Sequence, residues 1–178
     1  MRRIRLIHIL LILTVISGCK KIDKLTQFNM EFDESVIIPA TTPINLPFDL
    51  ITPEIQTDSE NTFGVNDTRK DLIEKIKLEK LTLSISQPSD ADFSFLNSVS
   101  VYLSAEGLPE IKVAWKENIP SNPGNTLDLD VTGDDLKQYI LKDSFKLRIN
   151  TITDKLLTRD YHIDLHSVFW VDAKILGQ

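Results

Sequence analysis

Cysteine is almost absent from this chain, because its 178 residues include only one, Cys19. A single thiol cannot form a disulfide within the chain, so a disulfide-stapled fold is excluded. The sequence also lacks the G-x-S-x-G, P-loop and H-E-x-x-H patterns, which supply a nucleophile, a phosphate cradle and a zinc site in enzymes. We therefore predict a protein that is not an enzyme and has no small-molecule cofactor.

Long apolar runs are also scarce, and the clearest one stands at the N-terminus. The basic start Met-Arg-Arg-Ile-Arg precedes the apolar stretch LIHILLILTVIS and then Gly18 and Cys19. A basic start, a short apolar core and small residues before a cleavage point are typical of a secretory signal. The run is shorter than the roughly 20 residues of a transmembrane helix. An uncleaved N-terminal anchor is the alternative interpretation.

The residues around the lone cysteine resemble the lipobox of bacterial lipoproteins, since Ile16-Ser17-Gly18-Cys19 follows the apolar-x-small-Cys pattern. The resemblance implies a signal peptide over 1–18 and lipidation of Cys19 as the first mature residue. Two or more acyl chains hold a protein stably to a bilayer, so the covalent lipid would be its membrane anchor. We expect a lipidated tether over 19–27 and a single domain over 28–178.

Basic residues are fewer than acidic ones, at 20 against 26. Removing the three arginines of the signal leaves 17 basic residues and a net charge of −9. An acidic protein is repelled by phosphate backbones, which excludes nucleic acid as an expected partner. Lysine after the cysteine implies, by resemblance to lipoproteins, transfer to the outer membrane. In the lipoproteins of the Bacteroidota that this segment is compared with, a short acidic run after the cysteine often accompanies export to the cell surface. The segment Lys20-Lys-Ile-Asp-Lys24 has one acid, so the resemblance favours the periplasmic face.

The first half of the domain carries alternating patterns separated by proline. Phe28, Met30 and Phe32 alternate with polar residues, which predicts a half-buried strand extended by residues 36–38. Prolines 39, 43, 47 and 53 then predict an extended, edge-like segment, and 56–67 reads as a polar loop.

The next segment has two interpretations. Asp67 and Thr68 can cap one or two helical turns reaching Ile76, after which residues 81–86 alternate as a strand. The apolar phase changes between these parts, which predicts a β-bulge near Glu79-Lys80. A continuous helix over 68–81 is the alternative.

The second half predicts a hairpin from 98–105 and 111–115 with Gly107 in its turn. A strand pattern follows at 127–131, and Thr132 can cap a helix over 133–142 whose first turn holds two carboxylates. Residues 145–149 and 161–176 alternate again. About seven short strands with one or two small helices indicate a mostly β fold, an immunoglobulin-like β-sandwich. The order of motifs over 75–178 is similar to that of small uncharacterised Bacteroidota lipoproteins.

The strongest metal candidate is His162-x-Asp164-x-His166. Alternate residues of a strand face one way, so these three side chains share a face and contain the donors that zinc prefers. A solvated polar face is the competing interpretation. Asp128-x-Asp130-x-Thr132-Gly resembles the start of a calcium loop, but Tyr139 replaces its final glutamate.

Aromatic residues make up 7% of the chain, and exposed ones could stack on sugar rings. Tyr102 lies out of phase with its apolar neighbours, and Trp170 shares the face of His162, so both are candidate ligand-binding residues. Trp115 is in phase with Ile111 and Val113, and we expect it in the core.

Taken together, these patterns predict a non-catalytic outer-membrane lipoprotein, an accessory or binding module of the cell envelope. The expected partners are the membrane, through the lipid, and another envelope protein. A glycan-binding lipoprotein and a metal-binding domain built on His162, Asp164 and His166 are the two alternatives.

Overall fold

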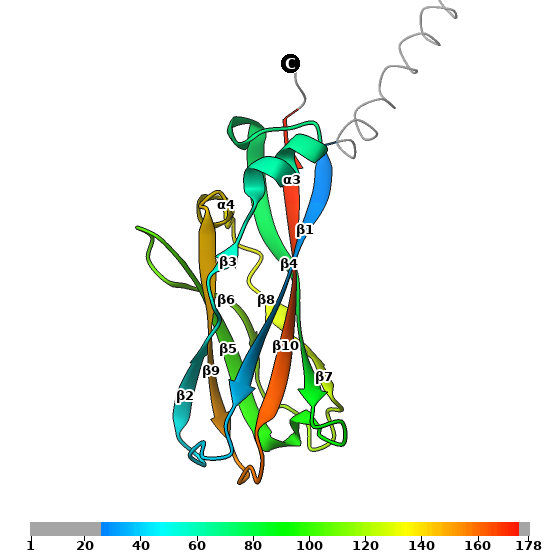
Figure 1. The fold of residues 1–178 in the computed structure, drawn as a ribbon, viewed down its shortest axis with the longest axis vertical. Coiled ribbons are helices and arrows are strands. Elements are labelled where there is room, and N and C mark those ends of the chain that lie inside the picture. Colours follow the sequence, from blue (N-terminus) through cyan, green and yellow to red (C-terminus); the bar gives the residue numbers. More distant parts are fainter. Residues whose placement is uncertain (1–25, 175–178) are drawn as a thin grey trace, which may run out of the picture.

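The computed structural model describes residues 26–174, which form ten strands, two short α-helices and two 3-10 turns (Figure 1). The strands are β1 (Gln27–Ile38), β2 (Pro47–Ile51), β3 (Ile55–Gln56), β4 (Ile73–Gln87), β5 (Leu96–Ala105), β6 (Ile111–Lys116), β7 (Thr126–Asp128), β8 (Asp130–Val131), β9 (Ser144–Thr153) and β10 (Tyr161–Ala173). The helices are α3 (Ser59–Val65) and α4 (Lys137–Ile140), and the turns cover Lys70–Leu72 and Phe93–Phe95.

The strands build two antiparallel sheets that pack as a sandwich. Sheet A has the order β1-β10-β4-β7, and sheet B has the order β2-β9-β5-β6-β8 with β3 also pairing with β9. The predicted mostly β sandwich is therefore confirmed, whereas its immunoglobulin-like topology stays a prediction. Strands β3, β7 and β8 have only two or three residues each, which is too short for an alternating pattern to be detected.

The core lies between the sheets because apolar side chains occupy alternate positions of the long strands. Along β9 every second residue is buried, from Phe145 to Thr153. Phe32, Phe145 and Phe169 meet edge to face, with ring centroids 5.2 to 5.8 Å apart. This trio joins β1 and β10 of sheet A to β9 of sheet B. Edge-to-face packing of this kind adds about 1 kcal/mol to the burial of each pair.

The predicted bulge in β4 is confirmed. Val168 of β10 faces Lys80 and the next residue, Phe169, faces Leu78, so Glu79 is the extra residue. The bulge lets the apolar residues on both sides of it point into the core. The alternative helix over 68–81 is wrong, since Ile73–Gln87 is one strand.

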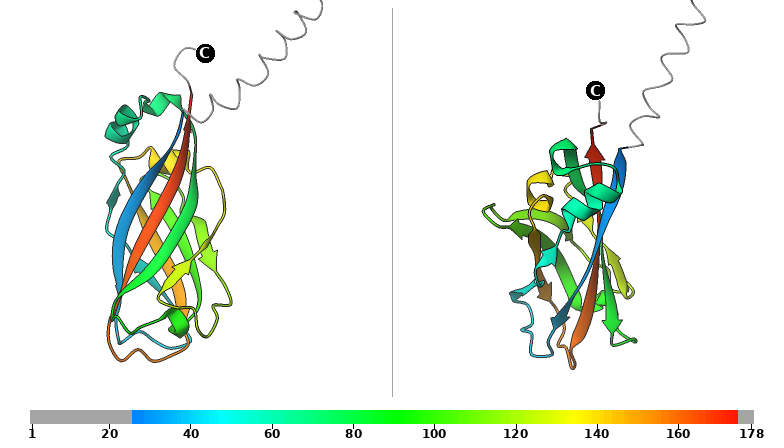
Figure 2. Two further views of the ribbon diagram at one scale, coloured as in Figure 1. Left: turned by 90° about the vertical axis from the view of Figure 1, so that its right-hand side faces the viewer. Right: turned by 45° about the horizontal axis from the view of Figure 1, so that its top comes forward.

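The two ends of the sandwich differ. β1 begins and β10 ends at one end, since Gln27 faces Asp172; we call it the tether end, and it lies at the top of Figure 1. The loops over 39–46 and 154–160 lie at the other end, called the distal end here (Figure 2). Cys19 lies outside the described residues.

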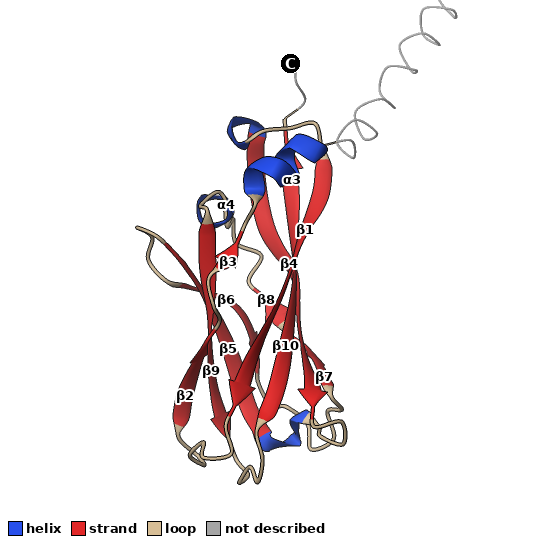
Figure 3. Cartoon of the chain, in the orientation of Figure 1, coloured by secondary structure: helices blue, strands red, loops and turns tan. Residues whose placement is uncertain are grey.

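One loop prediction and two helix predictions need correction (Figure 3). The segment over 56–67 is not only a loop: it contains α3, whose Phe63 is fully buried and packs its ring 6.1 Å from that of Phe28. One buried aromatic thus folds an otherwise polar segment onto the tether end. The predicted helical turns over 67–76 shrink to the 3-10 turn at Lys70–Leu72.

The predicted helix over 133–142 shrinks to the four residues of α4. The Asp135 carboxylate accepts hydrogen bonds from the backbone N–H of Ile76 and of Lys137, so it ties this segment to β4 before the helix begins. Within residues 26–174, no helix is long and apolar enough to cross a membrane.

Candidate binding sites

The outer face of sheet B carries the most connected polar cluster among the described residues. Strand register brings Asp49 of β2 opposite Asn150 of β9, and Arg148 of β9 opposite Tyr102 of β5. Glu110, just before β6, reaches the same place from the β5–β6 connection, which projects from the sheet (Figure 1). We call these five residues the Arg148 cluster.

Arg148 is held on two sides by carboxylates. Its Nη1 donates to Asp49 Oδ1 at 2.7 Å, while Nη2 and Nε donate to Glu110 at 2.6 and 3.0 Å. Paired contacts of this kind fix the plane of a guanidinium as well as its position. The guanidinium carbon lies 4.3 Å from the centre of the Tyr102 ring, a cation–π contact. The Arg148 side chain is still 25% exposed, so a ligand can reach it.

The charges of the cluster are stabilised by these contacts. The amide of Asn150 and then Arg148 lower the pKa of Asp49 below its ordinary value. The Glu110 and Asp49 carboxylates raise the pKa of Arg148. Both groups therefore stay ionised at neutral pH, and the cluster presents fixed charges at fixed positions.

Trp115 lies on the same face, which corrects the expectation that it belongs to the core. Val101 faces Ala114 but the next residue, Tyr102, faces Lys112, so Val113 is an extra residue in β6. Val113 and Ala114 are both buried, and the alternation then restarts with Trp115 outward and half-buried. Lys112 places its ammonium 5.3 Å from the centre of the Trp115 ring.

A hollow of about 490 Å³ adjoins this face at the ends of β5 and β9. Ser104 and Lys146, which face each other across these strands, help to line it, and Lys146 lies 3.2 Å from Glu54. Ser104 and Lys146 are each two residues from Tyr102 and Arg148, so they point to the same side of sheet B.

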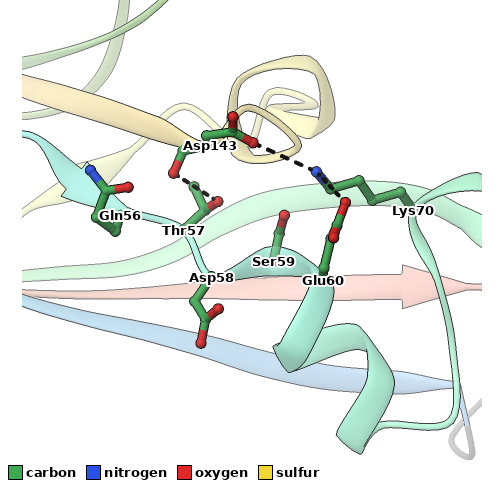
Figure 4. Close-up of a pocket in the computed structure, with 7 residues that line it drawn as sticks. All are labelled: Gln56, Thr57, Asp58, Ser59, Glu60, Lys70 and Asp143. Atoms are coloured by element: carbon green, nitrogen blue, oxygen red, sulfur yellow. Dashed lines mark hydrogen bonds and ion pairs between the residues drawn. The ribbon is translucent and has the colours of Figure 1, made fainter.

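A second polar hollow, of about 320 Å³, lies beside the start of α3 (Figure 4). Lys70 reaches Glu60 at 3.4 Å and Asp143 at 3.9 Å across it. Thr57 donates to the backbone carbonyl of Lys142 at 2.7 Å. The side chains at this hollow join α3 to the start of β9, which is a structural role.

The distal end exposes aliphatic side chains on two loops. Ile44, Leu46 and Leu156 are 39%, 57% and 67% exposed, and we call them the distal patch. The two loops are joined by the N–H of Ala40, which donates to the Asp160 carboxylate at 2.9 Å. The N–H of Asn45 donates to the carbonyl of Thr153, at the end of β9, at 2.7 Å. Exposed aliphatic groups on loops with fixed backbones form a surface already shaped for contact.

The structure does not assemble the predicted metal ligands. His162, Asp164 and His166 share the outer face of sheet A, as predicted. His166 instead contacts Asp33 of β1 through Nδ1 at 2.7 Å. Between residues 26 and 174, no group of three or more His, Cys, Asp or Glu side chains is placed to hold a metal ion.

The calcium-like segment also follows the strand interpretation. Asp128 ends β7 and Asp130 begins β8, and these two strands belong to different sheets. Asp128 accepts a hydrogen bond from the Thr82 hydroxyl at 2.6 Å.

The two predicted ligand-binding aromatics lie on different sheets. Tyr102 belongs to the Arg148 cluster, whereas Trp170 lies on β10 of sheet A beside a hollow of about 430 Å³ lined by Phe28 and Glu79. They cannot contact one ligand together.

Sequence reasoning missed most of the sheet B site: Asp49, Glu110, Trp115, Arg148 and Asn150. Asp49 and Arg148 are 99 residues apart, so no local motif joins them. One signal was available, because Arg148 and Asn150 occupy the outward phase of a strand that is otherwise apolar.

Comparison with known proteins leaves the family open. No protein-family model matches the chain, and no curated protein matches it. Solved structures with a similar arrangement include FLHE, at 7% identity over 82% of this chain and 98% of that one, with a TM-score of 0.33. A chain from Desmodium yellow mottle tymovirus is 11% identical over 85% of each chain, with a TM-score of 0.29.

Carbohydrate-binding modules of the β-sandwich superfamily also match, at 13% identity over 83% of this chain and 55% of that one, with a TM-score of 0.29. Likeness at this level carries no functional argument. What the fold and its surfaces define is a β-sandwich with a structured polar face and an apolar distal end.

Proposed function

We propose that this protein is a non-catalytic binding module, lipid-anchored through Cys19 to the periplasmic face of the outer membrane, and that its distal patch docks on another envelope protein. The observation that carries the proposal is the distal patch itself, with three exposed aliphatic side chains on two loops that are joined by the hydrogen bond from Ala40 to Asp160.

The length of the tether supports the direction in which this patch points. Cys19 and Gln27 are eight positions apart in the chain, a separation that spans about 27 Å at full extension. β10 alone has 13 residues, or about 40 Å along the sandwich. A lipid at Cys19 therefore leaves the distal patch unable to point into the same bilayer, and a protein is the occupant that fits.

The sheet edges are poorer docking surfaces than the distal loops. Glu34 stands in the core-facing phase of edge strand β1, between Phe32 and Val36, and is only half-buried. An inward charge on an edge strand disfavours pairing with another strand. Pro47 removes a backbone donor from edge strand β2, and β7 and β8 are very short.

Site-specific photo-crosslinking in cells tests the docking. A photoreactive residue at Leu46 should give one discrete crosslinked protein band, and Leu156→Asp should abolish it because it places a charge in the distal patch. Val65 is the matched control, since it is 81% exposed but lies in α3 at the tether end. Equal crosslinking from both positions, or none from Leu46, would contradict the docking proposal.

Membrane fractionation tests the anchor separately. Cys19→Ala should release the protein from the membrane fraction, because no acyl chain can then be attached. A Cys19→Ala protein that stays in the outer-membrane fraction would rule out the lipid anchor.

A further inference from the structure

We propose that the outer face of sheet B binds a neutral oligosaccharide, which stacks on Tyr102 and Trp115 and takes hydrogen bonds from the Arg148 cluster. This inference is independent of the docking surface at the distal end, because it uses a different face of the sandwich.

The aromatic part of the site comes from adjacent strands. Tyr102 faces Lys112 and Ser100 faces Trp115 across the β5–β6 pair, so the two rings are diagonal neighbours on one face. Both rings are half-buried, and a cation lies over one face of each, Arg148 over Tyr102 and Lys112 over Trp115. A sugar would therefore contact the parts of the two rings that these cations leave exposed. Apolar C–H faces of sugar rings stack on aromatic rings, and rings anchored in a sheet lose little conformational entropy when they bind.

The charge balance of the face selects the class of ligand. Arg148 and Lys112 carry two positive charges and Asp49 and Glu110 carry two negative ones, so the charges around the two rings balance. An anion would meet the carboxylates and a cation would meet the guanidinium. Hydroxyl groups both donate and accept hydrogen bonds, so a neutral polyol can satisfy all four groups.

Arg148 keeps capacity for a ligand. A guanidinium has five N–H donors, and the contacts to Asp49 and Glu110 use one on each of its three nitrogens. The two remaining donors lie in a plane that the carboxylates already fix. A ligand therefore binds to donors whose positions are already fixed, so binding loses little conformational entropy of the Arg148 side chain.

The neighbouring hollow extends the site along the strands. Its volume of about 490 Å³ lies within the range of small-molecule sites, roughly 300 to 1,000 Å³. Ser104, Ser144 and Lys146 line it together with the carboxylates of Glu54 and Glu106. The platform and the hollow together suit more than one sugar unit, so we commit to an oligosaccharide rather than a monosaccharide.

Tryptophan fluorescence gives a direct test, because Trp115 and Trp170 are the only tryptophans and lie on different sheets. The full-length protein in detergent micelles is titrated with cellopentaose, maltopentaose, xylopentaose and mannopentaose. At least one sugar should change the emission with a Kd in the range of roughly 10 μM to 1 mM. The change should persist in Trp170→Phe and disappear in Trp115→Phe.

Calorimetric titration of two further variants separates binding from folding. Tyr102→Leu keeps apolar bulk but removes the ring, and should weaken binding by about tenfold or more. Arg148→Lys keeps the charge but not the planar donor pair, and should weaken it by about fivefold. Thermal unfolding of each variant verifies that it is folded.

Three outcomes would overturn the inference: none of the four sugars binds, the fluorescence change follows Trp170 instead of Trp115, or both folded variants bind as tightly as the wild type.

Discussion

Strand β4 contains three extra residues relative to β10 and strand β6 contains one relative to β5, and the bulges at Glu79 and at Val113 have different consequences. At the β4 bulge that the sequence predicts, the extra residue is Glu79, which is exposed, and the bulge keeps apolar residues on both sides of it in the core. In β6 the extra residue is Val113, which is fully buried together with Ala114. The bulge at Glu79 therefore keeps apolar side chains of β4 in the core, whereas the bulge at Val113 places Trp115 on the outer face of sheet B.

The β6 bulge matters for the proposed ligand site because the alternation restarts after it. Without a change of phase, Trp115 would follow Ile111 and Val113 into the core, and the outer face of sheet B would lose one of its two aromatic rings. Bulges often redirect side chains next to functional sites. The buried extra residue Val113 thus determines that the Trp115 ring lies on the outer face of sheet B.

Deleting each bulge residue should separate these two roles and gives the largest effect. Deletion of Val113 removes a buried side chain and the carbonyl that accepts from the N–H of Thr132 at 3.0 Å. We expect it to lower the free energy of unfolding by about 3 kcal/mol. Deletion of Glu79 removes only an exposed side chain and should cost about 1 kcal/mol or less. Urea denaturation of the two variants measures both values.

The comparison would fail if the Glu79 deletion were the more costly of the two. That result would mean that the bend at the β4 bulge, rather than the buried volume, sets the energy. Val113→Ala is the control for volume alone, because it keeps the extra residue in β6.

The two bulges also explain how much of the fold the sequence can predict. Around Glu79 the apolar residues visibly change phase, between Leu78 and Leu81, so the sequence predicts the bulge. Around the β6 bulge, Val113, Ala114 and Trp115 are residue types that can each be buried or exposed. Their order therefore does not reveal the change of phase, and the sequence predicts an uninterrupted strand. Alternation can be detected only over several residues that are each clearly apolar or clearly polar. A long strand with one buried face provides enough of them, whereas the short strand β6 does not.

Helices and the ligand site were harder to predict for physical reasons. The apolar contact of α3 with the sandwich comes from Phe63, whose ring packs against Phe28, rather than from an apolar stripe along the helix. The Arg148 cluster joins residues from four segments, and only strand register brings them together. The pattern His162-x-Asp164-x-His166 is conspicuous along the chain, but within residues 26–174 no group of three such side chains is placed to hold an ion, and His166 contacts Asp33 instead.

A second prediction compares the outer faces of the two sheets. Arg148→Ala should lower the free energy of unfolding by about 1 to 2 kcal/mol, because it removes a cation–π contact and leaves two carboxylates close together. His166→Ala on sheet A removes one contact, to Asp33, between groups that are 40% and 79% exposed. It should cost about 0.5 kcal/mol or less.

Chemical denaturation at low salt and in 1 M NaCl measures this difference. The Arg148 effect should shrink in high salt, since screening weakens exposed charge pairs. If the two substitutions lowered the free energy of unfolding equally, the Arg148 cluster would stabilise the fold no more than the contact between His166 and Asp33 on sheet A.

The smallest effect concerns acid stability. Hydrogen bonds lower the pKa of Asp49 on sheet B, chiefly through Asn150, and of Asp128 on β7 of sheet A, chiefly through Thr82, below their ordinary value of 3.8. A carboxyl with a lowered pKa in the folded state adds stability above its ordinary pKa and loses it as the pH falls through the lowered value.

Asn150→Ala should therefore raise the pKa of Asp49 alone, and Thr82→Val that of Asp128 alone. Carboxyl carbon chemical shifts followed between pH 7 and pH 2 measure both. In each variant the loss of Tm relative to the wild type should be largest above pH 4 and decrease as the pH falls below it. If Asn150→Ala also moved the pKa of Asp128, the two faces would be coupled through the core rather than independent, and the contrast between the sheets would have to be abandoned.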